Sequence, residues 1–318
     1  VTDADLILGY LNPIYFLAGR KVLSKELALH AIKTKVADPL GMNITEAGNA
    51  ICTIVNAHMS DLIRGVTVGK GYDPRQCVLF AYGGAGPVHA AVYGREAKAI
   101  VVPVTASVNS AMGTLVSDIL HIYQLGARMP VPGDPDRFNR IFEDLETKAL
   151  KDLHGEGFSQ DAITLVRFVE MRYMRQVHQL KTPCPAGRLG PEDLENVCAV
   201  FQALYERRYG KGAAYKEAGM QIVTFRVEAR GRIPKPALSR REPKSADPSG
   251  AFKARRLGFL EGNRVEFNVY DFSKLEVGNV VPGPAIIETP VTTILIGLDQ
   301  VGSLDGYLNV IIRLKGAS

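Results

Sequence analysis

The sequence predicts an α/β fold, followed by an α+β segment and a β-rich C-terminal segment. Two apolar runs separated by a glycine turn indicate the first part, and later apolar residues at helical and then alternating spacing indicate the others. The 318 residues are 46% hydrophobic, as expected of a globular protein with more than one structural unit. We therefore expect domains at residues 1–120, 121–233 and 251–318. A linker rich in Pro, Arg, Lys and Ser is expected at 234–250.

Two helices are expected before the glycine turn. Residues 24–36 have apolar side chains at helical spacing, with Ser24 as the N-cap and Asp38-Pro39 as the stop. Thr45 can cap the next helix, whose broad apolar stripe predicts packing against the core, with His58 as a core histidine. The stripe contains Ile51, Ile54, Val55, His58, Leu62, Ile63 and Val66.

Two buried strands are expected on either side of the glycine turn. Cys77 to Tyr82 is continuously apolar, as in strands that are buried on both faces, and Ala99 to Pro103 is a second such run. Pro87 suits the first turn of a short helix between them. Strand, turn, helix and strand in this order favour a parallel pair joined by a right-handed crossover.

The later segments alternate between helix and strand. Apolar residues have helical spacing from Phe138 to Leu153 and from Pro191 to Tyr209, whereas 163–180 and 222–233 are strand-like. Short strands between Gly-containing turns are expected near Val265 to Val269, Ala285 to Ile287, Thr293 to Ile296 and Leu308 to Ile312.

The composition argues against several classes of protein. No apolar run approaches the roughly 20 residues that a membrane span needs, and the first residues lack the basic region of a secretory signal, so we expect a cytoplasmic protein without a membrane partner. The net charge of +5 comes from dispersed basic residues, so no nucleic-acid partner is predicted. Without CxxC spacing, the cysteines are predicted to be buried thiols, and no metal site is predicted. They are Cys52, Cys77, Cys184 and Cys198.

The turn from Gly83 to Pro87 is the strongest candidate for a binding site. Main-chain N–H groups of a glycine turn before a helix can approach an anion or a ribose closely. A Walker loop would need Gly-Lys-Ser/Thr, but this turn runs into Pro87-Val88-His89. A dinucleotide fingerprint also fails, because His89 stands at the third glycine and no acidic residue ends the next strand. A nucleotide contact and simple close packing of helix on strand both remain as explanations.

Charged residues cluster in the strand-like segment at 163–180 and at the end of the helix that follows it. Arg172, Arg175, His178 and the Glu206-Arg207-Arg208 group could bind a carboxylate or a phosphate, because guanidinium groups make paired hydrogen bonds to such anions. A structural ion-pair network is the interpretation that we favour. His121 is a single imidazole and identifies no chemistry.

Several segments together resemble one protein family. Phe80 to Ala90 is similar to the signature F-G-G-A-G-P-L-H-A of hydantoinase A proteins, and Thr2 to Phe16 is similar to T-D-A-n-l-v-L-G followed by L-N-P-d-Y-F. The chain thus resembles the hydantoinase A, oxoprolinase and ketone carboxylase family over nearly its whole length. Arg175 departs from the family pattern, which has glycine at that position. Further similar segments are 64–74, 110–113 with Asp118, 171–173, 206–210 and 283–288.

The resemblance implies a partial actin-like ATPase domain of the ribonuclease H-like type. In the family two loops of the D-x-G-G-T type hold the phosphates and the metal, and neither occurs in these 318 residues. The chain therefore corresponds to the C-terminal half of a typical member, and we expect no turnover by the isolated chain. The residues that the resemblance places at the adenosine side of ATP are Gly83, Gly84, Ala85, Gly86, Pro87 and His89.

The resemblance also implies a reaction and partners. The chain would be a small subunit of a hetero-oligomeric, ATP-dependent ketone carboxylase, beside a full-length hydantoinase A-like subunit and a hydantoinase B-like subunit. Such a complex would use ATP with Mg and bicarbonate to convert a ketone into a β-keto acid. A non-catalytic scaffold subunit, or a subunit of an ATP-dependent hydantoinase or oxoprolinase, remain the alternatives.

Overall fold

The computed structural model describes residues 1–213 and 218–316, which form two compact units. The first unit combines residues 1–114 with the described residues from 237 onward, and the second lies within 115–236. This division corrects the expected separate C-terminal domain at 251–318. Strand β13 (Val310–Leu314) pairs with β2 (Ala99–Val102), so the C-terminal strands complete a sheet that begins in the N-terminal part.

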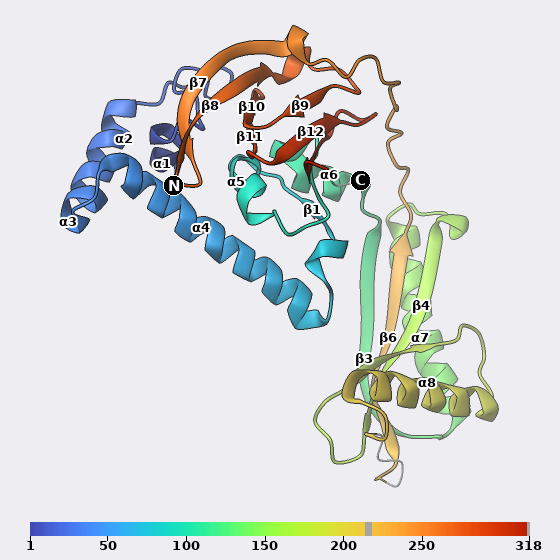
Figure 1. Ribbon diagram of the computed structural model, residues 1–318. Helices are drawn as coiled ribbons and strands as arrows, with labels where there is room; N and C mark the ends of the chain where they lie inside the picture. Colours follow the sequence, from blue (N-terminus) through green and yellow to red (C-terminus); the bar gives the residue numbers. More distant parts are fainter. Residues whose placement is uncertain (214–217, 317–318) are drawn as a thin grey trace. The chain divides into compact units, whose positions relative to one another are not determined.

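Residues 1–116 are mainly helical (Figure 1). Ser24 caps the second helix as expected, because its hydroxyl accepts a hydrogen bond from the Leu27 N–H. The helical run does not stop at Asp38-Pro39, since Pro39 occupies a first turn, where its missing N–H is not needed, and Gly41 ends the run in the left-handed region. The helices are α1 (Thr2–Ile7), α2 (Lys25–Ile32), α3 (Asp38–Leu40), α4 (Ile44–Thr67), α5 (Gly86–Tyr93) and α6 (Asn109–Val116), with a π-helical segment at Lys33–Ala37.

The described residues of the first unit form two sheets. One has the strand order β1-β2-β13-β12-β9, and the other has the order β11-β10-β8-β7. Strands β1 and β2 pair in parallel, as the order of strand, turn, helix and strand predicted. The remaining strands are β1 (Val78–Phe80), β7 (Phe252–Leu260), β8 (Asn263–Asp271), β9 (Val280–Pro282), β10 (Ala285–Glu288), β11 (Thr293–Ile296) and β12 (Gln300–Leu304).

Strand β1 is less buried than its sequence predicts. Val78, Phe80 and the adjoining Tyr82 are 47%, 58% and 48% exposed, although the run is continuously apolar. The cause is the position of β1 at the edge of its sheet, next to β2. Strand β2 is buried as expected. One face of β1 therefore presents apolar side chains that no described residue of this chain covers.

Asn43, and not the expected Thr45, caps helix α4. The Asn43 side chain accepts a hydrogen bond from the Glu46 N–H, and the Glu46 carboxylate accepts one from the Asn43 N–H. Such a capping box satisfies two N–H groups that the helix leaves unpaired, and a good N-cap stabilises a helix by about 1 kcal/mol. The helix continues to Thr67, past α5 (Figure 1).

The apolar stripe of α4 is covered only in part. Ile51, Val55 and Ile63 are half-buried, whereas Ile54, Leu62 and Val66 are exposed. His58 is exposed too, so the prediction of a core histidine is wrong. The stripe predicted the helix correctly, but in its second half Ile63 packs against the core while Leu62 and Val66 remain uncovered by the described residues of this chain.

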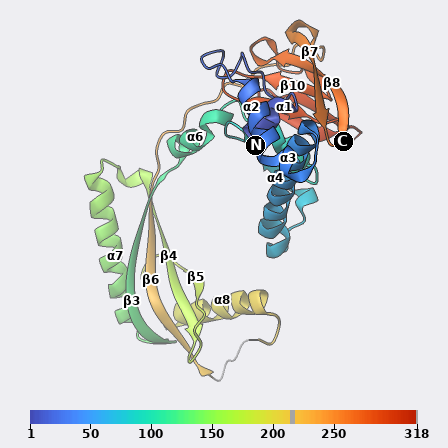
Figure 2. The same cartoon turned by 90° about the vertical axis from the view of Figure 1, so that its left-hand side faces the viewer.

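The second unit is an antiparallel sheet covered by helices α7 (Pro135–Gly155) and α8 (Pro191–Tyr209) (Figure 2). Its strand order is β3-β6-β4-β5. Both helices share one apolar core with alternate residues of the strands, so they cover the same face of the sheet. The strands are β3 (Ile119–Val131), β4 (Ile163–Tyr173), β5 (Leu180–Cys184) and β6 (Met220–Gly231).

Most elements of the second unit were predicted. Both helices and β6 lie where the spacing of apolar residues placed them. The single strand expected at 163–180 is in fact β4 and β5, which pair in antiparallel fashion after the chain reverses near Arg175. Strand β3 was not predicted, because its apolar residues do not alternate regularly with polar ones: Ile119, Leu120 and Ile122 are all apolar and all exposed.

Expectations about cysteines and membrane spans can also be compared with the structure. Cys52, Cys184 and Cys198 are buried free thiols, as predicted, and Cys77 is half-buried. Within residues 1–213 and 218–316, no helix combines the length and the hydrophobicity that crossing a membrane would require.

Candidate functional site

A cavity of about 310 Å³ lies in the first unit, where segments similar to the family motifs meet. It is lined by α1, by the loop after α1, by the glycine turn, and by the end of β10 with the chain that follows it. Residues of these four segments include Asp5, Tyr15, Gly84, Ala85 and Glu288. Residues that are far apart in sequence therefore share one site.

Hydrogen bonds fix the loop that follows α1. The Asp5 carbonyl oxygen accepts hydrogen bonds from the N–H groups of Tyr10 and Leu11, at 2.9 and 3.4 Å, and this ends the helix. The Asn12 side chain then accepts from the Ile14 N–H at 3.2 Å, which turns the chain before Tyr15. These contacts place the Tyr15 ring at the cavity.

The glycine turn leaves free space beside Gly84. Gly83 has φ +90°, a backbone conformation that favours glycine, and its N–H donates to the Ala106 carbonyl at 2.7 Å. The Gly84 carbonyl accepts from the Thr292 hydroxyl at 2.8 Å. A Cβ atom added to Gly84 would meet no atom within 4 Å, and one added to Gly86 would meet only the Tyr93 hydroxyl, at 3.9 Å. Close packing of helix on strand therefore does not explain Gly84.

Glu288 carries a buried negative charge beside the cavity. Its carboxylate accepts hydrogen bonds from Lys253, at 2.6 Å, and from Arg256. Burial alone would raise the pKa of Glu288, but these two cations outweigh burial and lower it. Lys253 Nζ also lies 3.6 Å from the centroid of the Tyr15 ring, a cation–π contact that ties this charge network to the cavity wall.

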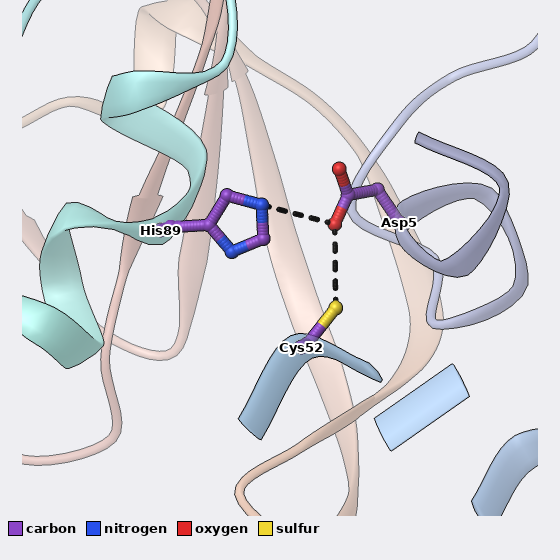
Figure 3. A group of neighbouring side chains, drawn as sticks. All are labelled: Asp5, Cys52 and His89. Atoms are coloured by element: carbon purple, nitrogen blue, oxygen red, sulfur yellow. Dashed lines mark hydrogen bonds and ion pairs between the residues drawn. The ribbon is translucent and has the colours of Figure 1, made fainter. Parts of the chain in front are cut away.

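Asp5, Cys52 and His89 come together from α1, α4 and α5, and all three are buried (Figure 3). His89 Nε2 lies 3.4 Å from Asp5 Oδ1, and the Cys52 thiol donates to the same oxygen at 3.6 Å. His89 Nε2 is shielded from solvent, yet it makes no hydrogen bond to a described residue. Burial, followed by the charge of Asp5, raises the pKa of Cys52 to about 12, so the thiol is protonated at neutral pH and is not an activated nucleophile.

The structure brings only some of the predicted nucleotide residues to these two places. Gly84 and Ala85 line the cavity, whereas His89 faces Asp5 and Cys52. Gly83, Gly86 and Pro87 line neither of them. Sequence reasoning did not connect Asp5 and Cys52 with His89. One signal could have identified this cluster: each of three separate helices has a side chain that can bind a metal ion on the face that packs inward.

The structure does not assemble the predicted charged group around Arg172. The Tyr173 ring packs 5.2 Å from that of Phe201 on α8, so strand alternation directs Arg172 to the opposite face of the sheet from Glu206. His178 is exposed. The sheet of the second unit has a different ion-pair network, in which Lys181, Arg226 and Arg230 surround the buried carboxylate of Glu228.

Arg175 occupies a backbone position that suits glycine. Its φ is +69°, in the left-handed region that residues with a Cβ avoid. The glycine that the family pattern has at this position is therefore explained by backbone conformation. Because Arg175 has a Cβ atom, the turn between β4 and β5 is locally strained at this residue.

Both parts of the chain match models of one family. Residues 1–123 match the model described as hydantoinase/oxoprolinase, and residues 134–315 match the model of the hydantoinase/oxoprolinase C-terminal domain. The chain therefore belongs to the hydantoinase/oxoprolinase family. The fold agrees with this assignment, since the structures of acetone carboxylase and of caprolactamase superpose on almost the entire chain.

Similar proteins include two carboxylases and a caprolactamase. The gamma subunit of acetophenone carboxylase from Aromatoleum aromaticum is 33% identical over 96% of this chain. The nucleotide-free structure of acetone carboxylase superposes with a TM-score of 0.84, at 29% identity over 98% of the chain. ATP-dependent caprolactamase from Pseudomonas jessenii superposes with a TM-score of 0.81, at 27% identity over 99% of the chain.

The chain spans less than half the length of these relatives. It covers 43% of the acetophenone carboxylase gamma subunit and 46% of each of the two solved chains. The expected resemblance to a subunit of a ketone carboxylase is confirmed. A small subunit was expected, whereas the relative with 33% identity is a gamma subunit of which this chain covers 43%.

Proposed function

We propose that this chain belongs to a multi-subunit, ATP-dependent ketone carboxylase similar to acetophenone carboxylase, and that its cavity takes the adenosine part of ATP. The complex would join a ketone and bicarbonate into a β-keto acid. Similarity to acetophenone and acetone carboxylases supports the reaction class. The observation that carries the adenosine assignment is the open space beside Gly84 at the cavity.

The cavity suits a nucleoside better than a whole nucleoside triphosphate. Its volume of about 310 Å³ is at the lower end of the range for small-molecule sites, roughly 300–1,000 Å³. Leu11, Tyr15, Phe16 and Val88 supply apolar and aromatic surface that suits a purine base. At Gly84 the backbone can approach a ribose without interference from a side chain.

The triphosphate and its Mg²⁺ ion would be held by residues outside this chain. The described residues that line the cavity include no lysine or arginine, and the carboxylate of Glu288 is already paired with Lys253 and Arg256. The 318 residues also contain no D-x-G-G-T loop. Phosphoryl transfer depends on fixed cations and a metal around the γ-phosphate, so we expect no ATP hydrolysis by the isolated chain. A phosphate-release assay on the purified chain tests this, and steady turnover would contradict it.

The uncovered apolar surface supports a role as one subunit of a hetero-oligomer. Leu62 and Val66 on α4, together with Val78 and Phe80 on β1, are exposed in the first unit. Exposed apolar surface of this kind is typical of an interface with another polypeptide. A full-length hydantoinase A-like subunit and a hydantoinase B-like subunit are the partners that we propose.

Replacing Gly84 in the assembled complex tests the adenosine site. A Gly84→Val complex should bind a non-hydrolysable ATP analogue at least about tenfold more weakly in calorimetry, because the side chain fills the space that the nucleoside needs. Its melting temperature should stay close to that of the wild type, since the new Cβ meets no atom within 4 Å.

Gly94→Ala is the matched control for the packing effect of a glycine. A Cβ there would lie 2.6 Å from Leu79 Cδ2 and 2.8 Å from the Ala90 carbonyl oxygen, so the melting temperature should fall while ATP affinity is unchanged. Unchanged affinity in a fully assembled Gly84→Val complex would exclude the nucleotide role. The chain would then be a scaffold subunit.

An ATP-dependent amidohydrolase is the second candidate. The superposition with caprolactamase, at a TM-score of 0.81 and 27% identity, favours it over other reactions. Assays of the complex with ATP separate the two candidates. A carboxylase fixes labelled bicarbonate into acid-stable product in the presence of a ketone, whereas an amidohydrolase opens a lactam or another cyclic amide without bicarbonate.

A further inference from the structure

The buried cluster of Asp5, Cys52 and His89 has the donor atoms of a zinc site. Carboxylate oxygen, cysteine sulfur and imidazole nitrogen are the ligands that Zn²⁺ uses in proteins. One such atom from each residue lies within 4.8 Å of the other two. We propose that Asp5, Cys52 and His89 bind one Zn²⁺ ion.

Two of the three ligand separations match the edges of a zinc tetrahedron, and the third, from Cys52 Sγ to His89, lies within 4.8 Å. With metal–ligand bonds of about 2.0 Å for oxygen and nitrogen and about 2.3 Å for sulfur, tetrahedral angles place oxygen roughly 3.3 Å from nitrogen and roughly 3.5 Å from sulfur. The structure has 3.4 Å from Asp5 Oδ1 to His89 Nε2 and 3.6 Å from Asp5 Oδ1 to Cys52 Sγ. An ion therefore fits between these atoms without a large movement of the helices.

The unpaired nitrogen of His89 is an independent sign of a ligand. His89 is 5% exposed, and its Nε2 makes no hydrogen bond to a described residue although a carboxylate oxygen lies 3.4 Å away. A buried polar atom without a partner is costly, and a bound ion removes that cost. Asn56 Oδ1 and Tyr173 Oη are also unpaired among the described residues, but His89 alone belongs to a group of potential metal ligands there.

The ion would join three helices that are separate in sequence. Asp5 is on α1, Cys52 on α4 and His89 on α5, so one ion would cross-link all three (Figure 3). Three protein ligands leave a fourth position for water or another oxygen donor. Because Asp5 also lines the 310 Å³ cavity, the ion would fix one wall of that cavity. On binding, the Cys52 thiol would release its proton to solvent and coordinate as a thiolate.

The site is tested by replacing the metal in the purified protein, together with the subunits that purify with it. After treatment with a chelator, the protein is reloaded with Zn²⁺ or Co²⁺ and freed of excess ion. We expect one zinc per chain above the content of the Cys52→Ala protein. We also expect the near-ultraviolet sulfur-to-cobalt band and the strong visible bands of tetrahedral Co²⁺. The absence of a sulfur-to-cobalt band in the wild type would overturn the proposal, whatever the variants do.

Variants then assign the ligands. Cys52→Ala should lose the sulfur-to-cobalt band, and Asp5→Asn should weaken Zn²⁺ binding at least about tenfold, because an amide oxygen is a weaker ligand than a carboxylate. Cys198→Ala is the matched control, since Cys198 is an equally buried thiol on α8 outside the cluster, and it should keep the full spectrum. A Cys52→Ala protein with wild-type cobalt bands would place the metal elsewhere and refute the assignment.

Discussion

The two units each bury a polar cluster, and the clusters differ in how completely they are hydrogen-bonded. In the second unit, Arg167 is 5% exposed, and its guanidinium makes two bonds to the Glu146 carboxylate, at 2.6 and 2.7 Å, and a third to the Gly187 carbonyl. In the first unit, the Cys52 thiol and His89 face the same oxygen of Asp5, and His89 Nε2 has no hydrogen bond to a described residue.

This difference separates a structural cluster from a binding site. Each nitrogen of the buried Arg167 guanidinium donates a hydrogen bond, and the group also lies 4.9 Å from the centroid of the Phe142 ring in an aromatic core, so this charge needs no further partner. A cluster with an unpaired nitrogen is incomplete without another atom. A ligand is therefore indicated where an unpaired buried atom lies beside other metal-ligating side chains, as at His89, and not by burial or charge alone.

The largest effect is expected from breaking the satisfied cluster. Arg167→Met leaves the Glu146 carboxylate without its partner, and breaking a buried ion pair typically costs about 3–5 kcal/mol of the free energy of unfolding. Hydrogen exchange should show faster exchange in α7 and β4, with α1 and α5 unchanged. A loss below about 1 kcal/mol would mean that the second unit does not depend on this cluster.

A smaller loss is expected at Glu288, a paired charge next to the cavity. Glu288→Gln should lower the free energy of unfolding by about 2 kcal/mol at pH 7, less than for a fully buried pair because Lys253 and Arg256 keep partial access to solvent.

The effect of Glu288→Gln should depend on pH. The pKa of Glu288 is lowered in the folded protein, so its contribution is present above the ordinary glutamate pKa of about 4.3 and is lost as the pH falls through the lowered value. Denaturant unfolding of both proteins at several pH values measures this. A difference between variant and wild type that grows below pH 4 would contradict the assignment.

If the second unit is purely structural, the substitution Arg175→Gly should raise the stability of the protein modestly. Arg175→Gly removes the strain of a side chain at φ +69°, which is worth about 1–2 kcal/mol, and part of this is offset by the greater freedom of glycine in the unfolded chain. The net gain should be about 0.5–1 kcal/mol in thermal unfolding. Arg175→Ala keeps the Cβ atom and should show no such gain, and any change of nucleotide affinity in the complex would assign function to this turn.

The smallest effect is expected from Asp5→Asn in metal-free buffer. Asparagine keeps the shape of Asp5 and can still accept the hydrogen bond from Cys52, so the free energy of unfolding should stay within about 1 kcal/mol of the wild type. Calorimetric scans with a chelator and with Zn²⁺ provide the measurement. At the same free concentration, zinc should raise the melting temperature of the wild type more than that of the variant, because the variant binds it at least about tenfold more weakly.

The sequence predicted individual elements better than their environment. The apolar spacing in α7, α8 and β6 identifies these elements because each packs against one core, where local pattern and tertiary contact agree. Strand β1 and the second half of α4 have equally clear patterns but are exposed, since a pattern cannot show whether a covering element exists in the same chain.

The candidate site was predicted only in part. The glycine turn was found because glycines before a helix have a local conformational signature. The cavity and the zinc cluster depend on contacts between α1, α4, α5 and the chain after β10, which no local pattern specifies. His89 was assigned to the nucleotide because it adjoins the turn in sequence, whereas its side chain faces the neighbouring helices.

The pairing of β13 with β2 gives the chain a fixed order of events during synthesis. Residues 115–236 form one continuous stretch, so all the strands of their sheet have left the ribosome before β13 is made. Strands β1 and β2, although translated earlier, must wait for β13 with their apolar residues exposed. The second unit can therefore fold before the sheet of the first unit is complete.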